Sequence, residues 1–231
     1  MFRLENVQKI YRRHGTSVTA FQCPALTIAE GEYAAILGPS GSGKTTLLSL
    51  LGGMLSPTQG RVWLGEQSLY DLSVAERARL RRDWLGFVFQ TFNLVPYLTA
   101  LENVQVPLCL AGLSAKEQRH RGEAMLERFG LRERLQHRPT ELSIGQQQRV
   151  ALARTLVSNP RVILADEPTG NLDPESRVLV LNSLSECHRE GRTVVMVTHD
   201  PVAAERAGRT LRLNGGELSD RGIVEEKRSV A

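Results

Sequence analysis

Residues 38–45 read GPSGSGKT, and the sequence on either side of this octapeptide decides the fold. Upstream, residues 33–37 (YAAIL) form a short apolar run typical of a β-strand, and downstream, residues 46–51 (TLLSLL) continue as a helix. A glycine-rich loop that joins a strand to a helix can wrap its backbone amides around phosphate oxygens, at the helix end whose dipole favours anions. A glycine-serine linker, the alternative interpretation, would not be flanked in this way. The stretch therefore predicts a nucleotide-binding α/β fold.

Two adjacent carboxylates extend this prediction far downstream. Residues 162–167 read VILADE, an apolar strand that ends in Asp166 and Glu167. In the loop, Lys44 can reach the outer phosphates and the Thr45 hydroxyl can ligate magnesium. Asp166 then supplies a second magnesium anchor, and Glu167, which is not expected to bind the metal, can orient an attacking water. The two motifs together predict hydrolysis of a nucleoside triphosphate.

Composition narrows the class of protein. The 231 residues are enough for one domain with a sizeable core. The three cysteines, Cys23, Cys109 and Cys187, lack CxxC spacing, which argues against a disulfide framework or zinc site and for a reducing compartment. A net charge of +4 is too mild to indicate nucleic-acid binding, so no nucleic-acid partner is expected. The most apolar stretch is interrupted by polar residues, so we expect no membrane-spanning segment.

The residue pattern changes character twice along the chain. Residues 2–37 are mostly strand-like, residues 91–158 are helical, and from residue 161 strands and helices alternate again. We therefore expect an α/β fold with a mostly parallel sheet, an antiparallel β subdomain, and a helical subdomain inserted after the strand that ends at Gln90.

These segments predict one domain over residues 1–231. Its nucleotide-binding core, with the β subdomain, would comprise residues 1–90 and 159–219. The Asn214-Gly215 pair predicts a hairpin near the end of that core. Residues 220–231 are highly charged and are expected to form a flexible tail.

Further motifs follow one another in a fixed order. They are an aromatic at Tyr11, the strand GFVFQ ending at Gln90, the segment LSIGQ at residues 142–146, NLD at residues 171–173, and His199 after VVMVT. With the two motifs above, the chain resembles the ATP-binding subunits of ABC transporters over nearly its whole length. The resemblance implies that ATP and Mg²⁺ are the ligands.

The resemblance also implies a dimer. Two copies would pack head to tail, with ATP held between Lys44 of one copy and Ser143 of the other. Ser143 and Gly145 open a helix, which is an arrangement suited to anions. Ile144 replaces the glycine of the family's commonest LSGGQ segment, but Ser143 and Gly145 are kept, so phosphate binding is expected to survive. The effect of Ile144 on dimer closure and turnover stays open. Hydrolysis would reopen the dimer and produce a mechanical stroke.

Residue roles follow from the same resemblance. Tyr11 would stack on adenine, Gln90 would contact magnesium or the attacking water, and His199 would bond the γ-phosphate and hold Glu167. The implied nucleotide contacts are Tyr11, Gly38, Pro39, Ser40, Gly41, Ser42, Gly43, Lys44, Thr45, Thr46, Ser143, Gly145, Gln146 and Asp173. The implied catalytic residues are Glu167, His199, Gln90 and Lys44, and the implied metal ligands are Thr45, Gln90 and Asp166. Alternatives stay open for Tyr11 as a surface residue, for Gln90 as a polar strand end and for Asp173 as a helix cap before Pro174.

A subgroup is indicated by the stretch that starts at Leu72 (LSVAERARLRRDWLGFVFQTFNLVPYLTALENV) and by EPTGNLD. Both resemble the lipoprotein-releasing, macrolide-efflux and cell-division ATPases. That resemblance implies a separate transmembrane permease subunit and a peripheral position at the cytoplasmic face of the inner membrane. Phe92, Leu94 and Tyr97 are candidate contacts for such a subunit, and core packing is an equally good interpretation of them.

Other classes of protein fit less well. A soluble or regulatory ABC ATPase that is not coupled to transport remains the alternative. A GTPase or small-molecule kinase would share the phosphate loop, but the chain has no NKxD segment, and LSIGQ and His199 have no role in those enzymes. A module that has lost catalysis is disfavoured because Lys44, Asp166 and Glu167 are all present.

Overall fold

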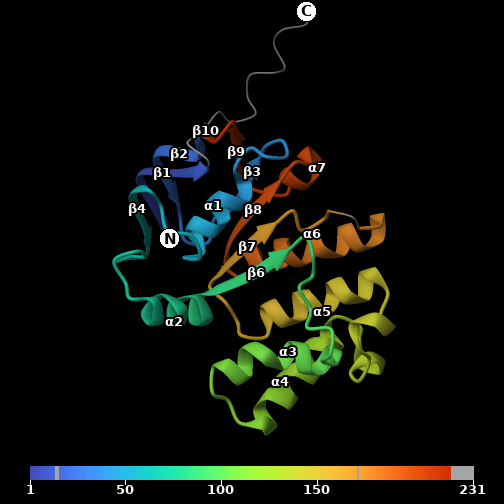
Figure 1. Ribbon diagram of the computed structural model, residues 1–231. Coiled ribbons are helices and arrows are strands. Elements are labelled where there is room, and N and C mark those ends of the chain that lie inside the picture. The colour runs from blue at the N-terminus through green and yellow to red at the C-terminus, as the bar shows by residue number, and fades with distance from the viewer. Residues whose placement is uncertain (14–15, 171, 220–231) are drawn as a thin grey trace, which may run out of the picture.

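The computed structural model describes residues 1–13, 16–170 and 172–219. A single sheet of ten strands runs through the described residues, in the order β5-β4-β1-β2-β10-β9-β3-β8-β7-β6 (Figure 1). The predicted tail over residues 220–231 and Asn171 of the NLD segment lie outside the described residues. None of the helices in the described ranges has the length and apolar character needed to cross a membrane.

Half of the sheet is parallel, as the sequence predicts. Its strands are β3 (Tyr33–Leu37), β6 (Leu85–Phe89), β7 (Val162–Asp166), β8 (Thr193–Thr198) and β9 (Arg209–Asn214). Every residue of β8 is buried, which explains its continuous apolar sequence, since helices cover both faces of a parallel sheet. The strand predicted to end at Gln90 ends one residue earlier, so Gln90 lies just beyond the strand.

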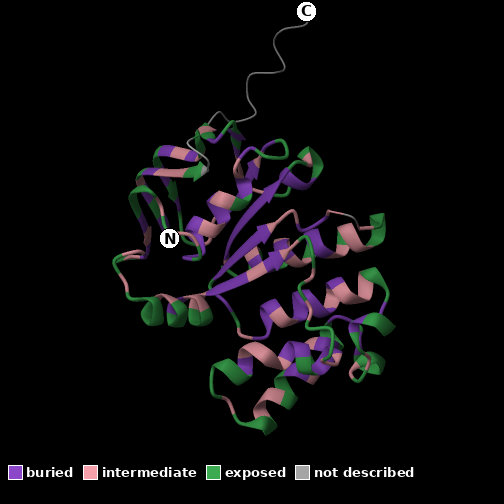
Figure 2. Cartoon of the chain, viewed as in Figure 1, coloured by how far each residue is buried: buried purple, intermediate pink, exposed green. Residues whose placement is uncertain are grey.

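The two faces of these strands pack into two separate cores. Tyr33 and Ala35 of β3 belong to one core, and Ala34 and Ile36, which alternate with them, belong to the other. Helix α1 (Lys44–Leu51) packs in the second core, whereas α6 (Pro174–Arg189) packs in the first. Figure 2 shows the central strands buried between these layers. The β–loop–α unit predicted around the octapeptide is therefore held rigidly from both sides.

The other half of the sheet is mainly antiparallel. Its strands are β1 (Phe2–Arg13), β2 (Thr16–Ile28), β4 (Gln59–Leu64), β5 (Gln67–Ser68) and β10 (Glu217–Ser219). The predicted hairpin is present as β9–β10, where Asn214 pairs with Glu217. Its two turn residues, Gly215 and Gly216, have φ of 54° and 85°, the left-handed values that a tight hairpin turn requires.

Three helices between β6 and β7 gather at one end of the molecule (Figure 1): α3 (Ala100–Leu110), α4 (Ala115–Arg128) and α5 (Ile144–Leu156). The 3-10 turns η1 (Arg132–Arg134) and η2 (Pro139–Glu141) belong to the same segment, whereas α2 (Val74–Trp84) precedes β6 and α7 (Pro201–Ala204) follows β8. Side-chain caps begin α3, α4 and α5, as Thr99, Ser114 and Ser143 each accept a bond from the backbone three residues on. Helices α3, α4 and α5 share a core with the sheet face that α6 covers.

Candidate functional site

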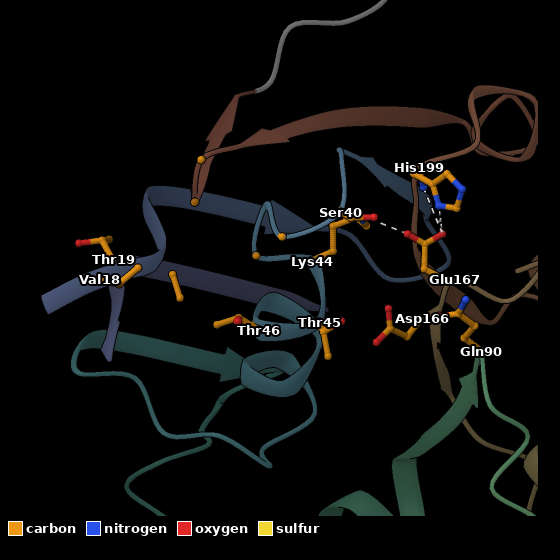
Figure 3. A pocket seen from close by; sticks show the side chains of 15 residues that line it. Val18, Thr19, Ser40, Lys44, Thr45, Thr46, Gln90, Asp166, Glu167 and His199 are labelled. Carbon is orange, nitrogen blue, oxygen red and sulfur yellow. Dashed lines mark hydrogen bonds and ion pairs between the residues drawn. The ribbon is translucent and has the colours of Figure 1, made fainter. Parts of the chain in front are cut away.

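A cavity of about 590 Å³ opens at the carboxyl ends of β3, β6, β7 and β8 (Figure 3). Its walls are formed by the phosphate loop, by the side chains of Gln90, Asp166, Glu167 and His199, and by residues of the β1–β2 and β9–β10 hairpins. The lining residues are Val18, Thr19, Ala20, Ser40, Gly41, Gly43, Lys44, Thr45, Thr46, Gln90, Asp166, Glu167, His199, Gly215 and Gly216. Carboxyl ends of parallel strands are where such sheets bind ligands.

Position 43 of the phosphate loop has room only for glycine. Its φ is 104°, and a Cβ there would lie 2.2 Å from the carbonyl oxygen of Ala20. The hairpin turn buttresses the loop from the other side, because the Gly216 amide donates to the Ser42 carbonyl at 3.0 Å. The loop therefore has its shape before any ligand binds, and its backbone amides need little rearrangement to receive phosphate oxygens.

Lys44 begins α1 and is only 6% exposed. Its ammonium donates to the carbonyls of Gly38, at 2.7 Å, and Pro39, at 2.9 Å. It also lies 3.2 Å from Oε1 of Glu167. A buried ammonium is costly unless its donors are satisfied, and these contacts satisfy them.

Glu167 is held through its carboxylate by two residues, Lys44 and His199. Its Oε2 accepts from the backbone N–H of His199, at 3.2 Å, and lies 2.9 Å from Nδ1 of the same residue. Its own backbone has a φ of 45°, unusual for a residue other than glycine. Such strain is typical of functional sites, where the surrounding structure fixes the conformation. The carboxylate is thus set between a lysine and a histidine at the mouth of the cavity.

Asp166 ends β7 deeper in the same cavity. Burial raises the pKa of Asp166, and a hydrogen bond from the Thr45 hydroxyl and the charge of Lys44 act against that rise. Gln90 follows Phe89, which pairs with Asp166 across β6 and β7. Figure 3 shows the Gln90 side chain next to Asp166. A hydroxyl, a carboxylate and an amide oxygen are the hard oxygen donors that Mg²⁺ prefers, so this set fits that metal.

A second hollow of about 440 Å³ lies at the N-termini of α5 and α6. It is lined by Ser143, Ile144, Gly145, Gln148, Arg149, Asp173, Glu175, Ser176 and Leu179. The two helix ends touch closely, because a Cβ on Gly145 would lie 2.5 Å from the Ser176 hydroxyl. Oε1 of Gln148 is buried beside this hollow without a hydrogen-bond partner. Asp173 caps α6 by accepting from the Ser176 amide at 2.9 Å, as the structural interpretation of this residue predicts.

The predicted site residues are therefore divided between two places. The first cavity gathers Ser40, Gly41, Gly43, Lys44, Thr45, Thr46, Gln90, Asp166, Glu167 and His199, and the second hollow gathers Ser143, Gly145 and Asp173. Gly38, Pro39 and Ser42 do not line the cavity; the first two accept from Lys44. The Gln146 side chain turns back to accept from the Ser143 amide at 3.0 Å and lines neither place.

Tyr11 is 46% exposed and does not line the first cavity. It pairs with Val18, which does line it, so both lie on the β1–β2 hairpin at the rim. The Lys9 ammonium lies 5.3 Å from the Tyr11 ring, a cation–π distance. The ring is thus near the cavity with a large exposed face.

Several lining residues had no signal in the sequence. Val18, Thr19 and Ala20 of β2 enter the first cavity only because that strand folds back beside the loop. Gly215 and Gly216 form the hairpin turn one residue later than the predicted Asn214-Gly215 pair, and nothing in the sequence indicated that this turn lies beside the phosphate loop. In the second hollow, Glu175 and Arg149 are ordinary helix-surface residues by pattern.

Comparison with known proteins agrees with this geometry. The family model described as ABC transporter matches residues 22–170. The macrolide export ATP-binding/permease protein MacB of Bartonella henselae is 48% identical over 93% of this chain, which spans only 33% of that relative. The ABC transporter ATP-binding protein YvrO of Bacillus subtilis is 45% identical, over 94% of this chain and 95% of its own.

Solved structures agree as well. The dimeric post-hydrolysis structure of the ATP-binding cassette MJ0796, bound to ADP and Pi, superposes with a TM-score of 0.89 at 42% identity. The superposition covers 96% of this chain and all of that one. The phosphate loop, the carboxylate pair and the second hollow on one chain, together with these matches, establish that the protein belongs to the ABC transporter family, as an ATP-hydrolysing cassette.

Proposed function

We propose that this chain dimerises on ATP, hydrolyses it, and thereby drives a separate membrane subunit. The observation that carries the proposal is that one chain has two separate sites suited to binding anions, the first cavity and the second hollow. The first has a phosphate loop and a candidate base, whereas the second has two helix N-termini and neither of those features. Two copies packed head to tail would bring the first place of one copy against the second place of the other. The dimeric cassette structures among its relatives support the formation of a dimer.

Binding would begin at the phosphate loop. The loop amides and the N-terminus of α1 would hold the phosphates, and Lys44 would turn its ammonium toward the outermost ones. Thr45, Asp166 and Gln90 would hold Mg²⁺, which supplies positive charge against the developing charge on the phosphate oxygens. The exposed ring of Tyr11 at the rim is the candidate platform for the adenine.

Hydrolysis would use Glu167. An ammonium has three N–H donors, and in this structure those of Lys44 serve two carbonyls and Oε1 of Glu167. When the ammonium turns to phosphate, its hold on Glu167 weakens and Oε1 can accept a proton from water. The water oxygen then forms a bond to the γ-phosphorus as the bond to the β-phosphate oxygen breaks, which releases ADP and phosphate. His199 keeps the other carboxylate oxygen in place throughout.

The segment between Gln90 and α3 is the proposed docking surface for the membrane subunit. Tyr97 is 83% exposed and Val95 is 39% exposed, whereas Leu94 packs against the core. Tyr97 is therefore the stronger candidate contact and Leu94 the weaker one. Several relatives are named as ATP-binding/permease proteins, which supports a permease partner and a peripheral position at the cytoplasmic face of the membrane. Macrolide export belongs to those relatives, and the cargo here would be set by the partner.

The first test is the oligomeric state of the Glu167→Gln protein. With ATP and Mg²⁺, size-exclusion chromatography with light scattering should show a dimer that returns to monomer when nucleotide is removed. Lys44→Ala in the same background is the control that should stay monomeric. A Glu167→Gln protein that stays monomeric at saturating ATP, or that hydrolyses ATP at the normal rate, would refute the proposed site.

The second test concerns the partner. Tagged Glu167→Gln protein should recover an integral membrane protein at a fixed ratio from gently solubilised native membranes, and Tyr97→Ala should reduce that recovery. Recovery of only soluble proteins, unaffected by Tyr97→Ala, would favour the alternative, an ABC ATPase that is not coupled to transport.

A further inference from the structure

Helix α6 lies between the second hollow and the candidate catalytic histidine. Its cap Asp173 and, from its first turn, Glu175 and Ser176 line the second hollow. The next residue, Arg177, reaches in the other direction and forms an ion pair with Asp200. Asp200 directly follows His199, whose backbone and ring both contact Glu167. A short path of contacts therefore runs from the second hollow to the candidate base within one chain.

Asp200 is held at three points. One carboxylate oxygen receives the Arg177 guanidinium, and the other accepts from the Val202 amide at 2.9 Å and so caps α7. Its backbone N–H donates to the Thr198 hydroxyl at 3.0 Å. His199 and Asp200 are joined by a peptide bond. A shift of Asp200 toward or away from α6 would therefore turn the His199 ring. The Asp200 side chain is 18% exposed, so water screens this pair only in part.

We infer that Arg177 is a positioning residue. By holding Asp200 against α6, it fixes the neighbouring His199 and so makes the candidate base, Glu167, sensitive to the helix that lines the second hollow. The inference rests on the proposed function, because it gives His199 and the second hollow their roles in one reaction. A plain structural role is the competing explanation. Part-exposed ion pairs contribute little to folding stability, so such a role predicts a small change in melting temperature and no selective change in turnover.

Two substitutions separate the ion pair from the helix cap. Asp200→Asn keeps an oxygen for the Val202 amide, since asparagine caps helices well, but loses the charge that pairs with Arg177. Arg177→Met removes the guanidinium and keeps much of the side-chain length. Arg206→Met is the control, because Arg206 also reaches α6, from the segment after α7, and donates to the Asn182 side chain at 3.3 Å.

Steady-state ATP hydrolysis then gives the decisive numbers. Arg177→Met and Asp200→Asn should each lower kcat by about tenfold with KM for ATP changed less than about twofold, and the double variant should be no worse than either single one. Arg177→Lys should recover part of the loss, and Arg206→Met should match the unaltered protein. The melting temperatures of all variants should stay close together.

Other outcomes would overturn the inference. Losses of kcat that multiply in the double variant would mean that the two residues act independently. A rise in KM with unchanged kcat, or an equal loss in Arg206→Met, would point to binding or to general loosening of α6. If the unaltered protein hydrolyses ATP and Glu167→Gln does not, normal turnover by Arg177→Met refutes this inference alone. If Glu167→Gln hydrolyses ATP normally, the proposed function fails and the inference fails with it.

Discussion

Gly145→Ala tests the contact between the two helix ends of the second hollow. A Cβ at this position would lie 2.5 Å from the Ser176 hydroxyl and 3.8 Å from a carboxylate oxygen of Asp173. A separation of 2.5 Å is about 1 Å too short for carbon and oxygen, so the hydroxyl must move. It can turn away only by giving up its bond to Asp173, which is 2.7 Å long.

The structure sets the size of the effect. A hydrogen bond to a charged group contributes about 1.5–3 kcal/mol, and its exposure here reduces the expected loss to about 1 kcal/mol. Alanine in place of glycine stabilises a helix by up to about 1 kcal/mol, so the free energy of unfolding should change little. The turned hydroxyl and the new methyl do change the lining of the hollow, where the partner's ligand would lie. Each 1 kcal/mol lost from that contact would weaken ATP-driven dimerisation about fivefold, and a loss of about this size is expected.

The assay is the concentration dependence of dimer formation in the Glu167→Gln background, with chemical denaturation run in parallel. Ser176→Ala supplies the compensating change, because it removes the hydroxyl but keeps the backbone N–H that Asp173 caps. Gly145→Ala combined with Ser176→Ala should dimerise as well as Ser176→Ala alone. If the double variant stays as weak as Gly145→Ala, the new methyl obstructs the partner's ligand directly and the contact with α6 is not the cause.

The remaining predictions concern single side chains. Lys44→Ala should weaken ATP binding by the monomer, measured by calorimetry, because the outer phosphates lose their ammonium. Glu167→Gln should keep ATP affinity and lower turnover by a factor on the order of 10² or more; near-normal turnover would exclude it as the base. Ser143→Arg should abolish dimerisation without lowering monomer affinity for ATP, and a loss of that affinity would contradict a site in trans. Asn103→Leu should lower the free energy of unfolding by about 3 kcal/mol, because the fully buried Asn103 bonds the Val95 amide and the Leu98 carbonyl, whereas Asn182→Leu on an exposed helix face should change it by less than about 0.5 kcal/mol.

Local chemistry explains which parts of this molecule could be predicted. The strand, loop and helix over residues 33–51 are specified by one contiguous motif, and the structure places them as expected. The helix start at Ser143 and the hairpin that follows Asn214 likewise depend on a few adjacent residues. Each of these features needs only near neighbours to form, so its signal survives in the sequence.

The contacts that join distant segments could not be predicted in the same way. The Gly216 amide supports the phosphate loop through Ser42, although 174 positions of sequence separate the two residues. Arg177 and Asp200 meet only because α6 and the turn after β8 lie side by side in the fold. Pairing of this kind depends on the register of the sheet, which hydrophobic periodicity does not fix for strands buried on both faces.

The charges of the second hollow indicate why it would not bind nucleotide by itself. Two helix N-termini and Arg149 attract an anion there, but the carboxylates of Asp173 and Glu175 line the same hollow and oppose it. With these opposing charges, the hollow would bind a phosphate group only when other protein groups have already neutralised part of the phosphate's charge. The phosphate loop, Lys44 and the proposed magnesium ligands would provide that neutralisation. The hollow is therefore expected to bind ATP already held by a second copy and to ignore free phosphate, so that ATP binding by the monomer comes first and leads to dimerisation.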